Sequence, residues 1–183
     1  MESGLVRCTQ KKGLTSLDLA VTALLISAGA VIRMVVPPLG GITPNFAIAM
    51  YSLAIILARP KYTQALGIGL VAGAVCMFTS KAAYPVNLVS ESIGALVCLV
   101  VCQFTENRCK GFILNPLIIT ALATLASGLS FIGTYFIFKL APVAVIVSQM
   151  LMTVIILTVL NSLIVQVLYF PAKKMLKNMR SGE

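Results

Sequence analysis

The sequence contains no histidine, and its five cysteines include no Cys-x-x-Cys pair. Histidines and paired cysteines supply most zinc and redox sites, so neither metal binding nor redox chemistry is expected. The chain also lacks a P-loop, a Gly-x-Ser-x-Gly elbow and paired aspartates. Because it lacks these groups, it cannot hydrolyse ATP by itself, and an enzymatic role is disfavoured. A binding or transport role without a cofactor is favoured instead.

Charged residues are scarce as well. They make up 10% of the chain, whereas 59% of the residues are hydrophobic and the mean hydropathy is +1.01. A soluble domain of 183 residues exposes too much surface to be this apolar. No segment shows the alternation that is typical of a transmembrane barrel strand. The composition therefore predicts an all-α, polytopic membrane protein in a lipid bilayer.

The apolar segments predict six transmembrane helices, since roughly 20 residues cross a bilayer. They cover about residues 17–36, 43–58, 63–80, 86–104, 114–138 and 142–170. We expect a single transmembrane domain over residues 1–183, with short tails at about 1–15 and 172–183. Loops between the segments are short, and no soluble domain is predicted.

The net charge of +9 is carried by short basic clusters between the apolar segments. There is no long basic face with interleaved aromatic residues, so nucleic acid is not an expected partner. Eleven of the 14 cations lie on one side of the predicted bundle. The other three, Arg33, Lys81 and Lys139, lie on the opposite side. The positive-inside rule then places both termini in the cytoplasm and these three cations outside.

The segment from Val36 to Asn45 is unusual, because it contains prolines and adjacent glycines but almost no polar residues. Its backbone cannot continue as a helix. Irregular backbone near a membrane persists where it packs on protein or lines a cavity. We therefore predict a structured cap on the outer face, whose key residues are Pro37, Gly40, Gly41 and Pro44.

Glu91 and Arg33 are the strongest candidates for a binding site, since ionisable residues within membrane helices usually have a function. Glu91 lies about one turn into the fourth segment, and Arg33 lies in the last turn of the first. The structural alternatives are a salt bridge from Glu91 to Lys81 and extension of Arg33 to the lipid headgroups. If the two charges face one pocket, they suit a zwitterionic ligand. The Arg33 guanidinium would bind the carboxylate of the ligand, and the Glu91 carboxylate would bind its ammonium group.

Other polar residues are predicted near the same outer level, and each has a structural alternative. Amides and phenols can orient a ligand, but they also cap helices or join them by hydrogen bonds. The candidates are Asn45, Tyr84, Asn87, Tyr135 and Gln149. Asn161 is predicted to lie deeper and to join helices.

Small residues four apart occur on two segments. Ala23 and Ser27 form such a step on the first, and Gly67, Gly69 and Gly73 recur on the third. Small residues let two helices approach closely, either within the bundle or between subunits.

The chain resembles the substrate-binding S components of energy-coupling factor (ECF) transporters, specifically those of the tryptophan-transporter type. The resemblance covers most of the chain. It rests on Pro-Pro-Leu-Gly-Gly at 37–41 with Pro44 and Asn45, Arg-Pro at 59–60, the glycine-rich third segment, Pro85 and Asn87, Leu-Asn-Ser at 160–162, and Tyr-Phe-Pro at 169–171.

This resemblance implies a membrane subunit that captures a small solute outside a prokaryotic cell and delivers it inward. The implied partners are a transmembrane scaffold subunit and two cytoplasmic ATPases. Ala23 and Ser27 match the family's alanine-based docking motif, with Ser27 in place of the second alanine. The Pro-Gly segment becomes a candidate lid over the pocket. Tryptophan, or another aromatic or vitamin-like compound, is the implied solute, and a stand-alone ion-coupled carrier is the alternative.

Overall fold

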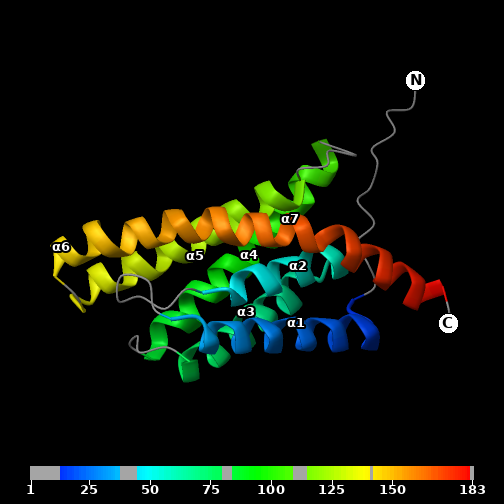
Figure 1. Ribbon diagram of the computed structural model, residues 1–183, viewed down its shortest axis with the longest axis horizontal. Coiled ribbons are helices and arrows are strands. Elements are labelled where there is room, and N and C mark those ends of the chain that lie inside the picture. The colour runs from blue at the N-terminus through cyan, green and yellow to red at the C-terminus, as the bar shows by residue number, and fades with distance from the viewer. Residues whose placement is uncertain (1–12, 38–44, 80–83, 109–114, 141, 182–183) are drawn as a thin grey trace.

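The computed structural model describes residues 13–37, 45–79, 84–108, 115–140 and 142–181. In chain order the helices are α1 (Ser16–Val35), α2 (Ala47–Ala58), α3 (Tyr62–Thr79), α4 (Tyr84–Arg108), α5 (Asn115–Ile137), α6 (Val143–Val145), the π-helix η1 (Ile146–Met150) and α7 (Leu151–Ser181). Because α6, η1 and α7 follow one another directly, the described residues form six helical rods (Figure 1). The all-α fold class is confirmed.

Four stretches are long and apolar enough to cross a membrane: Ser16–Val35, Val86–Thr105, Asn115–Ile137 and Val143–Arg180. Ala47–Ala58 and Tyr62–Phe78 are shorter apolar helices. The multi-pass architecture is therefore clear, whereas a full crossing by these two helices stays a prediction. The segment predicted as a C-terminal tail is helical, since α7 continues through Pro171 to Ser181, and Figure 1 shows it turning near this end.

The short helix α2 lies at the centre of the bundle. It contacts α1, α3, α4, α5 and α7, and all of its residues except Leu57 are buried. A helix that is apolar all round is stable only when other helices surround it. Its 12 residues rise about 18 Å, less than the roughly 30 Å hydrocarbon core of a bilayer. At least one end of α2 must therefore lie below the membrane surface if the bundle spans the bilayer.

Helices α3 and α4 approach closely along two glycines. A Cβ atom on Gly69 would lie 2.7 Å from the Ser92 Cα, and one on Gly73 would lie 2.8 Å from the Leu88 Cα. Both distances are too short for any side chain, so the contact depends on glycine. Gly67, in contrast, faces open space. The small-residue pattern of this segment therefore serves packing inside the bundle at Gly69 and Gly73.

The beginning of α1 and the end of α7 meet at one end of the bundle, where Arg180 donates a hydrogen bond to Asp18 (Figure 1). Asp18 also closes a capping box with Thr15, which explains where α1 begins. At the opposite end, Pro37 is exposed just after α1. Gly40, Gly41 and Pro44 of the predicted lid, and Lys81, lie outside the described residues.

Candidate functional site

Glu91 is the centre of a buried polar cluster between the helices. Its side chain is 1% exposed in the middle of α4. Asn45, just before α2, donates a hydrogen bond from Nδ2 to Glu91 Oε1, and Ser127 on α5 donates one from Oγ to Oε2 at 3.4 Å. Three separate segments therefore meet at one carboxylate.

Arg33 brings a positive charge to the same cluster. It is 4% exposed, so it does not extend to the headgroups, and its charge interacts with Glu91. Its Nε and Nη1 atoms are buried without a hydrogen-bond partner among the described residues. Buried guanidinium donors are costly when they are left unpaired. Arg33 is therefore a buried cation with unused hydrogen-bonding capacity, within electrostatic range of the Glu91 carboxylate.

Asn45 connects the cluster to two further helices. Its Oδ1 accepts a hydrogen bond from the Cys76 Sγ of α3 at 3.5 Å, and its backbone carbonyl accepts one from the Asn161 Nδ2 of α7 at 3.2 Å. Asn161 joins helices as predicted, but it does so at the level of the cluster rather than beneath it. Asn45 is thus held by α3, α4 and α7 together.

Asn87 lies one helical turn before Glu91 on α4, and residues four apart share a helix face. It is 2% exposed, and its Nδ2 atom has no hydrogen-bond partner among the described residues. Like Arg33, it is a buried donor without an acceptor. The structure therefore brings together four of the predicted site residues: Arg33, Asn45, Asn87 and Glu91.

Two of the remaining predicted site residues, Gln149 and Tyr135, are not part of this cluster. Gln149 is exposed on η1, and its backbone carbonyl accepts a hydrogen bond from Thr153. Tyr135 is half-buried and stacks on Phe131, with 4.8 Å between the ring centroids. The side chain of Tyr84 lies outside the described residues.

Sequence reasoning missed three members of the cluster. Two of them are Cys76 and Ser127, a thiol and a hydroxyl of kinds that are common in apolar helices and that give no distinct signal in the sequence. Tyr51 is fully buried in α2, and its hydroxyl lies against Gly94 without a hydrogen-bond partner among the described residues. Its influence on Glu91 is therefore electrostatic, at a distance longer than a hydrogen bond. A phenol in the middle of an otherwise almost wholly apolar helix is the sequence feature that identifies Tyr51 as a candidate.

Residues 15–177 of the chain match the family described as Tryptophan transporter TrpP, from the cap of α1 into the last turns of α7. The chain belongs to the TrpP family. A similar protein of Bacillus subtilis (strain 168), named a probable tryptophan transport protein, is 27% identical over 123 residues. The alignment covers 64% of this chain and 68% of that protein. No solved structure matched the chain.

Membership of the TrpP family confirms the tryptophan-transporter resemblance expected from the sequence. Together with the long apolar helices, it identifies a multi-pass membrane protein with a transport role. The TrpP match includes every residue of the buried cluster. The cluster therefore lies within the part of this chain that matches the family.

Proposed function

We propose that this TrpP-family protein is the substrate-binding subunit of an importer and that it binds tryptophan at the cluster around Arg33 and Glu91. The observation that carries the proposal is a buried cation with unpaired donors within electrostatic range of a buried carboxylate. An amino acid presents the complementary pair. Its carboxylate accepts hydrogen bonds from Arg33, and its ammonium group donates to Glu91.

The position of α2 supports binding of the substrate carboxylate near the N-terminus of this helix. The helix begins at Ala47, directly after Asn45, and its cap residue Phe46 makes no side-chain hydrogen bond to the first turn. The first backbone N–H groups of a helix have no partner within it, and they carry the positive end of the helix dipole. Transporters commonly direct such short-helix ends at anionic groups of the substrate.

The proposal also includes the source of energy for import. The chain has no ATP-binding motif, so import against a gradient needs either partner ATPases or an ion gradient. We favour an ECF arrangement with a scaffold subunit and two ATPases, because exposed small residues, Ala23 and Ser27, lie on α1 where another helix can dock. The alternative is a stand-alone ion-coupled carrier, for which Glu91 is the buried titratable group.

Binding can be measured directly, because the chain contains no tryptophan and the fluorescence of the ligand has no protein background. We expect the purified protein in detergent micelles, which contain no scaffold protein, to bind tryptophan. Arg33→Gln and Glu91→Gln should each weaken binding about 10- to 100-fold, since a hydrogen bond to a charged group contributes roughly 1.5–3 kcal/mol. Lys139→Asn is the matched control, because Lys139 is an exposed cation away from the cluster.

Unchanged affinity in both cluster variants would exclude this site. Mass spectrometry of small molecules that co-purify with the protein distinguishes tryptophan from another aromatic or vitamin-like solute. Affinity purification from the native membrane distinguishes the energy sources, since an ECF subunit brings down two ATPases and a scaffold protein. A carrier instead transports alone in liposomes under an ion gradient.

A further inference from the structure

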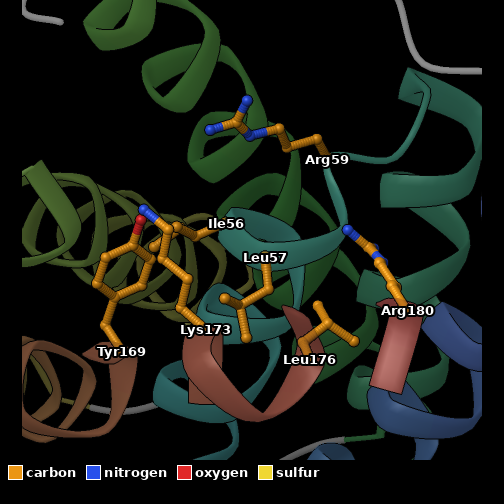
Figure 2. A pocket seen from close by; sticks show the side chains of 7 residues that line it. All are labelled: Ile56, Leu57, Arg59, Tyr169, Lys173, Leu176 and Arg180. Atoms are coloured by element: carbon orange, nitrogen blue, oxygen red, sulfur yellow. The ribbon is translucent and has the colours of Figure 1, made fainter. Parts of the chain in front are cut away.

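A hollow lies at the opposite end of the bundle from Arg33, between the end of α2 and the last turns of α7. Its volume is about 200 Å³, and Ile56, Leu57, Arg59, Tyr169, Lys173, Leu176 and Arg180 line it (Figure 2). The four α7 residues recur at the spacing of one helix face. This cavity is not part of the proposed tryptophan site, and membership of the family does not by itself explain it.

The lining divides into an apolar floor and a basic rim. Ile56 and Leu176 are buried, whereas Arg59 and Lys173 are exposed at the edge. In Figure 2, Tyr169 and Lys173 lie on one side, Arg180 lies on the other, and Leu57 and Leu176 lie between them. An apolar floor below separated cations fits a group that is charged at one end and apolar at the other.

The charge of the rim is only partly compensated. Three of the seven lining residues are basic and none is acidic. Asp18 pairs with Arg180 from outside the lining, and it also accepts hydrogen bonds from Thr15. The Lys173 ammonium lies 5.3 Å from the centre of the Tyr169 ring, which orients it without neutralising it. Lys173 therefore leaves a positive charge in the cavity that no acidic residue of the lining balances.

Two features hold the rim in place. Arg180 is oriented by Asp18, which is 2% exposed and belongs to the α1 cap. Arg59 ends α2 in the left-handed conformation, with φ at 52°, and Pro60 prevents the helix from continuing. The basic groups are thus presented from fixed helix ends rather than from a loose tail.

We propose that this cavity binds a phosphate group, with the phosphate of an anionic phospholipid as its expected source. The cations of the chain place this end at the cytoplasmic surface, where anionic lipids are available and basic pockets between helices bind their headgroups. The volume is below the roughly 300–1,000 Å³ of pockets for drug-sized ligands, which suits a headgroup better than a whole transported solute. This inference does not depend on which solute is transported.

The test uses the full-length protein in detergent, titrated with phosphatidylglycerol or with phosphatidylcholine and analysed by native mass spectrometry. We expect preferential retention of phosphatidylglycerol. Lys173→Gln and Arg59→Asn should each weaken it about fivefold, since one basic residue near an anionic surface contributes roughly 1 kcal/mol. Asparagine is chosen at position 59 because it tolerates the left-handed conformation.

Lys174→Gln is the matched control, because Lys174 is an exposed neighbour that does not line the cavity. It should behave as the unmodified protein does. A parallel thermal-shift titration with inorganic phosphate identifies the source. If phosphate stabilises the unmodified protein but not Lys173→Gln, and the two lipids are retained equally, the site is assigned to soluble phosphate.

Three results would overturn the proposal. The first is equal retention of the two lipids without any effect of phosphate. The second is an equal loss of lipid in Lys174→Gln and Lys173→Gln, which indicates diffuse attraction to a basic helix. The third is unchanged retention in both cavity variants. Gel filtration and the thermal unfolding midpoint establish that each variant is folded before its lipid binding is compared.

Discussion

At the scale of single residues, Asp18 combines two tasks that are usually separate. Its carboxylate accepts hydrogen bonds from the Thr15 backbone N–H at 3.1 Å and from the Thr15 hydroxyl at 2.9 Å, which caps α1. The same carboxylate pairs with Arg180 near the end of α7. Since Asp18 is almost fully buried, these partners replace the water that an exposed carboxylate would have.

We expect Asp18→Ala to lower the free energy of unfolding by about 1–2 kcal/mol, because it removes both the cap and the ion pair. Arg180→Gln should have a smaller effect, since its side chain is 36% exposed. The double variant should fall less than the sum of the two, with a coupling of about 0.5–1 kcal/mol, because the Arg180 side of the pair is open to solvent. Unfolding in mixed detergent micelles measures all three, and strict additivity would contradict a direct Asp18–Arg180 interaction.

At the scale of helices, the contact between α3 and α4 positions the buried cluster. Gly73 lies against Asn87 and Leu88, and Gly69 lies against Glu91 and Ser92. The two glycines of α3 thus touch the α4 backbone at two residues of the candidate site. A change in this contact should move Asn87 and Glu91 relative to α1.

Gly73→Ala should therefore destabilise the bundle by about 1–3 kcal/mol, the usual cost of adding atoms to a packed interface. A Cβ atom there would lie 2.9 Å from the Asn87 carbonyl oxygen, so α3 and α4 must separate. Gly67→Ala is the control on the same helix, and it should be neutral or slightly stabilising because that position is open. Thermal unfolding in detergent compares them, and equal midpoints would refute the close-contact explanation.

At the scale of the whole molecule, the two ends of the bundle differ in chemistry. One end holds a buried Arg33–Glu91 cluster, and the other holds a basic rim around an open cavity. Between them, α1 presents Ala23 and Ser27 on its exposed surface. This surface is the proposed contact with a scaffold subunit, and it is separate from both ends.

A bulky residue on this surface should separate transport from binding. We expect Ala23→Trp to abolish tryptophan uptake by cells while binding by the purified protein persists, because the close approach of another helix is lost. Val100→Trp is the control, since Val100 is 50% exposed on α4 and takes no part in the proposed contact. Uptake that survives Ala23→Trp would show that α1 does not dock in this way.

Much of the fold was predictable from the sequence because it depends on local properties. Apolar composition and segment length predicted an all-α membrane protein, and the described helices occupy the predicted segments. The Pro-Gly segment and its accompanying motifs indicated the tryptophan-transporter family. Scarcity of charge in apolar segments also singled out Arg33 and Glu91, because each such residue is costly in a membrane.

The partners of these residues were decided only by the tertiary structure. Helix α2 is apolar on every side, so its sequence does not reveal which face meets α4 or α5. The hydrogen bonds from Asn45 and Ser127 to Glu91, the burial of Arg33 and the cavity between α2 and α7 all depend on how such helices are rotated against one another. In a membrane bundle that rotation is determined by side-chain packing between helices, which no single helix encodes.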